Sequence, residues 1–205
     1  MPIIKDSCQD GVTLVRDWIY EASRQLSAAD IPSAHLDAEI ILAHVLEKDR
    51  TYLHAHPEQI ISSDNCNIAN KLLKKRSQRI PLAYLFGYKE FYGRKFHVNK
   101  HTLIPRPESE DIINLLKDYK IPGKIKLADV GTGSGCIGIA AKLENPELDI
   151  TLIDISQEAL EIAKKNASSL AVKVSLLCSD LLTNYLDRPD IIIANLPYVD
   201  KTWDR

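Results

Sequence analysis

The sequence predicts a mixed α/β protein that consists of a small helical bundle, a β-hairpin and a doubly wound parallel sheet. Three observations support this fold class. Apolar residues recur every three or four positions over the first eighty residues, as on amphipathic helices. Aromatic residues crowd around turn glycines between residues 84 and 104. From about residue 124 onward, short apolar runs alternate with helical stretches, which is the order of a βαβ sheet.

The composition is that of a soluble globular protein and excludes several other classes. Of 205 residues, 45% are hydrophobic and 26% are charged, which excludes a disordered chain, a collagen-like repeat and a disulfide scaffold. The formal charge of −2 creates no strong field that would attract nucleic acid or an anionic membrane. No apolar run approaches the roughly 18 residues of a membrane span, and the N-terminus lacks the pattern of a signal peptide. We therefore expect a cytoplasmic protein.

The cysteines predict neither a metal site nor a redox site. They are widely separated, at positions 8, 66, 136 and 178, and none belongs to a CxxC pair. Zinc sites usually need such pairs or clustered histidines. We expect four reduced thiols and no bound metal.

The first half of the chain contains helix signals and one basic run. Ser33 is placed to cap a helix that ends near Leu46, and further helices are expected at 51–55 and 63–78. The first helix carries an apolar stripe made of Val12, Val15, Ile19, Ala22 and Leu26. The basic run consists of Lys71, Lys74, Lys75, Arg76 and Arg79. It could bind an acidic or nucleic-acid partner, but the solvated face of a helix is the favoured interpretation.

The second half has the pattern of parallel strands covered on both faces. Strands are expected at 125–130, 150–154, 172–177 and 191–194 because these runs are apolar without polar alternation. Helices are expected at 136–144 and 156–168. A stiff segment, Ile104-Pro105-Arg106-Pro107-Glu108-Ser109-Glu110, precedes this domain and leads into a helix with an acidic first turn.

A glycine-rich loop follows the first of these strands and opens a helix, which is where a nucleotide-type cofactor binds in this architecture. Asp154 ends the next strand, where its carboxylate can accept hydrogen bonds from both hydroxyls of a ribose. The loop and this acid give the candidate cofactor residues Asp129, Gly131, Thr132, Gly133, Ser134, Gly135 and Asp154.

Two kinds of cofactor are compatible with the glycines. Gly133, Gly135 and Gly138 satisfy GxGxxG, and Asp154 lies at a distance suitable for a dinucleotide enzyme. However, Asp129 stands two residues before Gly131, and the resulting DxGxGxG resembles the S-adenosylmethionine loop of class I methyltransferases. A loop that binds no ligand would not need three regularly spaced glycines together with Asp129 and Asp154 at the ends of neighbouring strands. We favour S-adenosylmethionine.

The fourth strand ends in Asn195-Leu196-Pro197-Tyr198, which resembles the (N/D)PPY-type motif of methyltransferases that act on planar nitrogen. The Asn195 side-chain oxygen and the Leu196 carbonyl can each accept one N–H of the substrate. Pro197 restricts Leu196 to an extended backbone, and Tyr198 offers a flat face to a planar group. These four residues are the candidate catalytic and substrate-binding residues.

These motifs together are similar to those of the release factor glutamine methyltransferases, the PrmC/HemK family. The resemblance runs from about residue 10 to the end and is carried by Leu36-Asp37-Ala38-Glu39, Phe91-Tyr92-Gly93, the 104–110 segment, the glycine loop and Asp154-Ile155-Ser156. It implies a class I S-adenosylmethionine-dependent methyltransferase (Rossmann-like) domain at 106–205, a hairpin linker at 84–105 and a helical substrate-recognition domain at 1–83.

The resemblance also implies a function. The family transfers a methyl group from S-adenosylmethionine to the side-chain amide nitrogen of the glutamine in the Gly-Gly-Gln motif of peptide chain release factors. Asp180 and Leu181 would line the adenine, and Asn195 would touch both cofactor and substrate. Arg106 and Glu108 would either shape the pocket wall or serve the fold alone.

Departures from the family pattern leave alternatives open. Leu196 stands where the family usually has proline, and the tetrapeptide looks more like that of the rRNA adenine dimethyltransferases, so rRNA adenine N-methylation is the second hypothesis. Ser109 replaces the family's usual threonine. A non-catalytic binding module and a dinucleotide oxidoreductase are the remaining alternatives.

The length of the sequence is a further departure. The family's domain continues past the tetrapeptide with further strands, whereas this sequence has seven more residues. We therefore expect an incomplete domain that lacks its last strands, with an unpaired edge on the fourth strand. We also expect weak stability and weak activity from these 205 residues alone.

Overall fold

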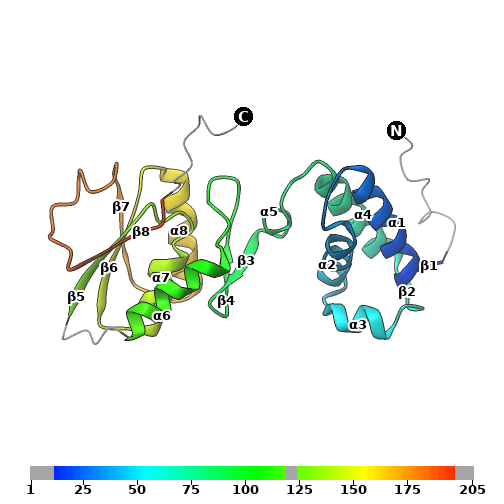
Figure 1. The fold of residues 1–205 in the computed structure, drawn as a ribbon, viewed down its shortest axis with the longest axis horizontal. Coiled ribbons are helices and arrows are strands. Elements are labelled where there is room, and N and C mark those ends of the chain that lie inside the picture. The colour runs from blue at the N-terminus through cyan, green and yellow to red at the C-terminus, as the bar shows by residue number, and fades with distance from the viewer. Residues whose placement is uncertain (1–11, 119–123, 197–205) are drawn as a thin grey trace. The chain divides into compact units, whose positions relative to one another are not determined.

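The computed structural model describes residues 12–118 and 124–196 (Figure 1). The chain divides into two compact units, and the boundary between them lies after Phe86. Within the described ranges, no helix is long and apolar enough to cross a membrane. The predicted fold class is confirmed, because the first unit is helical and the second contains a hairpin and a parallel sheet.

The first unit is a helical bundle whose helices follow the predicted ones closely. Its helices are α1 (Val15–Ala28), α2 (Ala34–Leu46), α3 (Arg50–Ala55), α4 (Ser63–Ser77) and α5 (Leu82–Phe86). Two short strands, β1 (Thr13–Leu14) and β2 (Ile60–Ile61), pair antiparallel. The α1 stripe is buried as predicted except for Val12, which is 69% exposed because the helix begins only at Val15.

Buried charges join the helices of this unit. The Nε of Arg76 in α4 donates to Oδ2 of Asp37 in α2 at 2.6 Å, and both side chains are largely buried. The interpretation of the basic run as a wholly solvated face is therefore wrong at Arg76. Glu39, also buried, accepts a hydrogen bond from Arg50 at 2.8 Å and contacts the rings of His35 and His54 at 3.1 Å. The Leu36–Glu39 motif thus supplies both acidic partners that tie α2 to its neighbours.

Two other expectations for this unit are wrong. Ser33 occupies the position before α2, but its side chain makes no capping hydrogen bond within the described residues. Its backbone, with φ −93° and ψ 26°, is not in the extended conformation that aims a capping hydroxyl at the helix. Cys66 is disulfide-bonded, whereas Cys136 and Cys178 are free. Spacing in sequence did not indicate this bond, because a disulfide requires only that two cysteines meet in space.

The second unit begins with the hairpin formed by β3 (Tyr88–Phe91) and β4 (Arg94–His97). The hairpin starts later than expected, since residues 84–86 belong to α5. A short 3-10 helix, η1 (Pro107–Ser109), then leads into α6 (Glu110–Asp118). Both Phe91 and Phe96 are buried in the core of this unit.

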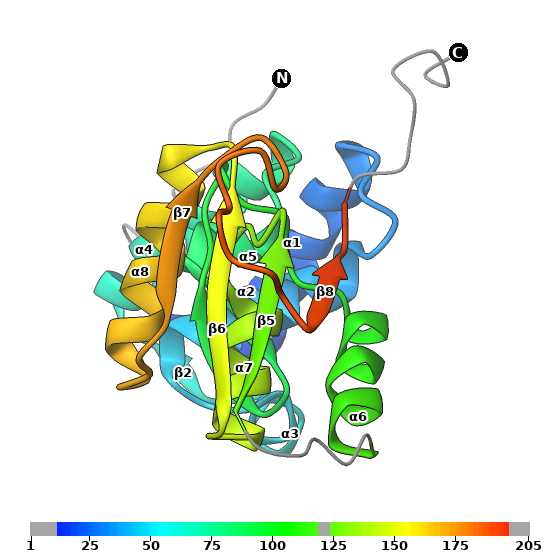
Figure 2. The same cartoon turned by 90° about the vertical axis from the view of Figure 1, so that its left-hand side faces the viewer.

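A parallel sheet forms the centre of the second unit. The strands β5 (Ile125–Val130), β6 (Leu148–Asp154), β7 (Ser175–Cys178) and β8 (Ile191–Ala194) lie in the order β7-β6-β5-β8 (Figure 2). The helices α7 (Cys136–Glu144) and α8 (Gln157–Ser169) connect the first three strands. β7 begins three residues later than predicted, because Val172 still donates a backbone hydrogen bond to Ala167 at the end of α8.

The hairpin, α6, α7 and α8 share one core with the sheet. Ile113 of α6, Ile139 of α7, Ala163 of α8 and Leu127 of β5 are fully buried in it. On β8, Ile193 is buried but Ile192 is 53% exposed, and β5 is the strand that pairs with β8 among the described residues. Among the described residues, the edge expected on the fourth strand of the sheet is therefore the side of β8 that faces away from β5.

Candidate functional site

A cavity of about 280 Å³ lies at the carboxyl ends of β5, β6 and β8. Its wall contains most of the predicted site residues, namely Asp129, Gly131, Thr132, Gly133, Ser134, Asp154, Asp180, Leu181, Asn195 and Leu196. Gly135 lies just behind the wall at the start of α7, where a Cβ would face Ile139. Pro197 and Tyr198 lie outside the described residues.

The glycine loop turns sharply between β5 and α7. Gly131, Gly133 and Gly135 all have positive φ angles, of 69°, 55° and 76°. The N–H of Thr132 donates to the carbonyl of Ile153 at 2.9 Å, which fixes the loop to the end of β6. The loop approaches the cavity with its backbone, and glycine is the residue that adopts such angles without steric cost.

Asp129 anchors the loop from inside. The side chain is 2% exposed, and its Oδ2 accepts hydrogen bonds from Thr132 Oγ1 at 2.6 Å and from the Gly138 N–H at 3.0 Å. Burial raises the pKa of this carboxyl to about 6, although the two hydrogen bonds partly oppose the rise. Because the folded-state pKa lies above the ordinary value, ionisation of Asp129 lowers stability as the pH rises from about 4 to about 6.

Asp154 presents two acceptor oxygens at the end of β6. Its Oδ2 accepts from the Gly133 N–H at 2.8 Å, and its Oδ1 accepts from the Ser156 N–H at 2.9 Å. Each carboxylate oxygen can accept more than one hydrogen bond, so both can still receive a ligand hydroxyl. The backbone carbonyl of Asp154 also accepts from the Ser179 N–H at 3.0 Å, which holds the segment of Asp180 against this strand end.

Asn195 follows β8 directly beside the glycine loop. The pairing of Ala194 with Val130 brings Asn195 level with Gly131 on the neighbouring strand. The Nδ2 of Asn195 donates to Ser109 Oγ at 3.1 Å. The Leu196 side chain occupies the space that a Cβ on Gly131 would fill. Leu196 thus packs against the glycine loop, and Asn195 is held by Ser109.

Several wall residues were not predicted from the sequence. His101, Leu103 and Pro105 line the cavity together with Arg106, whereas Glu108 is not among the described lining residues. The segment Ile104–Glu110 indicated part of this wall, but no sequence pattern singled out His101. Burial raises the pKa of the Cys136 thiol, which also lines the cavity, to about 12, so this thiol stays protonated at neutral pH.

Asn166 supports the cavity wall from behind and was not indicated by the sequence. It is fully buried on α8, and its Nδ2 donates to the carbonyls of Ser134 at 2.8 Å and His97 at 3.0 Å. Its Oδ1 accepts from the His97 N–H at 2.7 Å. Asn166 therefore fixes the glycine loop to the hairpin, and a single asparagine within a helix carries no motif that would reveal this.

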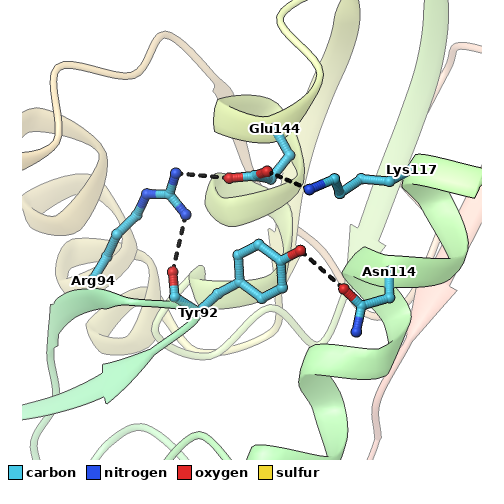
Figure 3. Close-up of polar contacts among 5 residues, drawn as sticks. All are labelled: Tyr92, Arg94, Asn114, Lys117 and Glu144. Carbon is cyan, nitrogen blue, oxygen red and sulfur yellow. Dashed lines mark hydrogen bonds and ion pairs between the residues drawn. The ribbon is translucent and has the colours of Figure 1, made fainter.

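A polar cluster holds the hairpin turn against α6 and α7 (Figure 3). Glu144 accepts hydrogen bonds from Lys117 Nζ at 3.0 Å and Arg94 at 2.7 Å, and both partners lower the pKa of its carboxyl. Arg94 also donates to the carbonyl of Tyr92 at 3.0 Å, and the Tyr92 hydroxyl donates to Asn114 at 2.9 Å. This cluster fixes the hairpin to the helix that follows Ser109.

Both units of the chain are similar to known proteins. Residues 17–87 match the PrmC N-terminal domain, and residues 112–204 match the methyltransferase small domain. A release factor glutamine methyltransferase of Koribacter versatilis is 40% identical over 182 residues, which are 87% of this chain and 65% of that protein. The enzyme of the same name from Leptospira interrogans is 40% identical over 181 residues, which are 85% of this chain and 63% of that protein.

Over most of its length, this chain is similar to the release factor glutamine methyltransferases. The two matched regions fall on the helical unit and on the sheet that carries the cavity. The chain spans 61% to 65% of the length of four curated relatives of this name.

Proposed function

We propose that this protein transfers a methyl group from S-adenosylmethionine to the side-chain amide nitrogen of the glutamine in the Gly-Gly-Gln motif of peptide chain release factors. The observation that carries the proposal is the position of Asn195, whose amide lies in the cavity wall beside the glycine loop. The names of the relatives support the choice of substrate. The proposal assigns the protein to the cytoplasm, where translation terminates.

The cavity fits S-adenosylmethionine. Asp154 offers paired acceptors for the two ribose hydroxyls, and Asp180 and Leu181 would flank the adenine. The hydroxyl of Ser134 is buried beside the cavity without a hydrogen-bond partner in the described part of the chain, so it can bond a ligand. Asp129 adds negative charge near a cationic cofactor. When bound, the cofactor supplies an electrophilic methyl group.

The role of Asn195 and Leu196 follows from the weakness of the nucleophile. An amide nitrogen is unreactive because its lone pair is delocalised into the carbonyl. If Asn195 Oδ1 and the Leu196 carbonyl each accept one N–H, the nitrogen is oriented and positive charge developing on it is stabilised. By family resemblance, Pro197 and Tyr198 would complete the grip on the glutamine.

The domain assignment is part of the proposal. We infer that residues 1–83 recognise the release factor, that 84–105 link the domains and that 106–205 carry out the transfer. The match of residues 17–87 to the PrmC N-terminal domain supports the first assignment. Among the described residues, no group of three metal-ligating side chains occurs, and the proposed chemistry uses none.

Cofactor affinity is predicted to fall as the pH drops below about 6. Protonation of Asp129, whose pKa is about 6, removes a negative charge near a cationic ligand, so affinity is full above this pH and decreases below it. Calorimetric titration at several pH values measures this. Asp129→Asn should bind more weakly at pH 7 and lose most of the pH dependence.

His101 also lines the cavity, so the titrations are repeated with His101→Gln, which keeps Asp129 in place. If the affinity of Asp129→Asn still falls with pH as steeply as that of the wild type, Asp129 is not the group responsible.

Label transfer from tritiated S-adenosylmethionine tests the proposed function. The full gene product is offered a release factor, the same factor with Gln→Ala in its Gly-Gly-Gln motif, and ribosomal RNA. Label on the unchanged factor alone supports the proposal. Label on RNA would favour adenine methylation, the alternative suggested by Asn195-Leu196-Pro197-Tyr198.

A further inference from the structure

We propose that Ser109 is a positioning residue that orients the side-chain amide of Asn195. This inference rests on the proposed function and adds a residue to it. Ser109 Oγ accepts a hydrogen bond from Asn195 Nδ2 at 3.1 Å across 86 positions of sequence. Both residues line the cavity, and they approach it from different elements, η1 and the end of β8.

The hydrogen bond engages one end of the amide and leaves the other end available to a substrate. An asparagine side chain has a donor end and an acceptor end, and its terminal torsion has broad, roughly two-fold preferences. Because Ser109 engages Nδ2, Oδ1 remains as the acceptor. A rotated amide would present its NH₂ to the NH₂ of glutamine, where donor would face donor. In the structure, Ser109 therefore holds Asn195 in the orientation that can bind the reacting nitrogen.

Ser109 is itself held rigidly. Its N–H donates to the carbonyl of Arg106 at 3.0 Å, and prolines at 105 and 107 restrict the backbone on either side of Arg106. The next residue, Glu110, accepts a hydrogen bond from the Tyr92 N–H at the hairpin turn at 2.8 Å. The hairpin cluster of Figure 3 fastens the same turn to α6 and α7. Because these contacts fix the backbone around Ser109, its hydroxyl can hold the side-chain amide of Asn195 in one position.

Replacement of Ser109 separates a positioning role from a structural one. Ser109→Val removes the hydroxyl and introduces a β-branched side chain, and Ser109→Thr is its matched control, which introduces the same branched shape but retains a hydroxyl. We expect Ser109→Val to lower kcat about 10- to 100-fold, the loss typical of a misplaced catalytic group. The KM for release factor and the Kd for S-adenosylmethionine should stay within about two-fold. Ser109→Thr should remain close to wild type.

A double variant tests whether Ser109 acts through Asn195. Once Asn195 is alanine, removing the hydroxyl has nothing left to misorient, so Ser109→Val with Asn195→Ala should be no slower than Asn195→Ala alone. Losses that multiply in the double variant would overturn the proposal. Wild-type kcat in Ser109→Val would also overturn it.

A readout independent of catalysis separates this inference from the proposed function. Hydrogen exchange of the Asn195 side-chain amide, assigned by its absence in Asn195→Ala, should be slow in wild type and Ser109→Thr and at least about ten-fold faster in Ser109→Val. If release factor is not methylated but this pattern holds, the function is wrong and the positioning contact stands. Equal exchange in all three proteins would refute the contact.

Discussion

Asn195→Ala is expected to lower methyl transfer to release factor roughly 100- to 1,000-fold, the range found when one preorganised hydrogen-bonding group is removed from an active site. The variant loses the side-chain oxygen proposed to accept an N–H from glutamine. Cofactor affinity should change by no more than about three-fold, because the glycine loop and Asp154 stay intact. Single-turnover transfer and calorimetric titration measure the two quantities.

Asn145→Ala is the matched control for this variant. Asn145 is also an asparagine of the second unit that makes a side-chain hydrogen bond, but its Oδ1 accepts from the Glu147 N–H at 3.3 Å, after the end of α7. Its loss should leave transfer within about two-fold of wild type, since its contact lies outside the cavity wall. The proposed role of Asn195 fails if Asn195→Ala transfers methyl at the wild-type rate, or if lost cofactor affinity accounts for the whole decrease.

Gly131→Ala is expected to weaken cofactor binding by at least about ten-fold and to lower the stability of the domain. The φ of Gly131 is +69°, where a residue with a Cβ is about 1–2 kcal/mol less stable than glycine. The new methyl group would also overlap the Leu196 side chain. Either the loop or Leu196 must move, and both line the cavity.

Gly133→Ala separates the two causes. Its φ is +55°, but the nearest atom to a new Cβ is the Leu103 nitrogen at 3.9 Å, which is ordinary contact. Gly133→Ala should show the loss of stability caused by a Cβ at positive φ, but no steric overlap. Its loss of cofactor affinity should therefore be smaller than that of Gly131→Ala. Adding Leu196→Ala to Gly131→Ala should recover part of the affinity. The steric account is contradicted if the double variant binds no better than Gly131→Ala, as measured by titration and thermal unfolding.

Much of the second unit could be predicted because its signals are local. The bounds of β5, β8 and α7 follow from apolar runs that stop at polar or glycine residues, and the observed bounds agree with the prediction. The glycine loop lines the cavity, because the pairing of β5 with β8 puts the ends of these strands side by side. In the first unit, helical periodicity alone located α1 and α4.

The features that escaped prediction depend on contacts between distant segments. Arg76 belongs to a basic run, but its burial depends on Asp37, which lies 39 positions earlier. Asn166 joins the glycine loop, through Ser134, to His97, which lies 69 positions earlier, and neither Asn166 nor His97 forms part of a motif. Ser109 was noted only as a replacement for threonine, because its bond to Asn195 exists only once the sheet and η1 are assembled.

Mass spectrometry of the modified release factor is the most direct test of the proposed reaction. The full gene product is incubated with S-adenosylmethionine and a release factor, and the peptide that contains the Gly-Gly-Gln motif is fragmented. The proposal predicts one added methyl group on the side-chain amide of the glutamine, and far less of this product in the same time with Asn195→Ala. A methyl group on another residue, or an unmodified factor beside methylated adenine in ribosomal RNA, would contradict it.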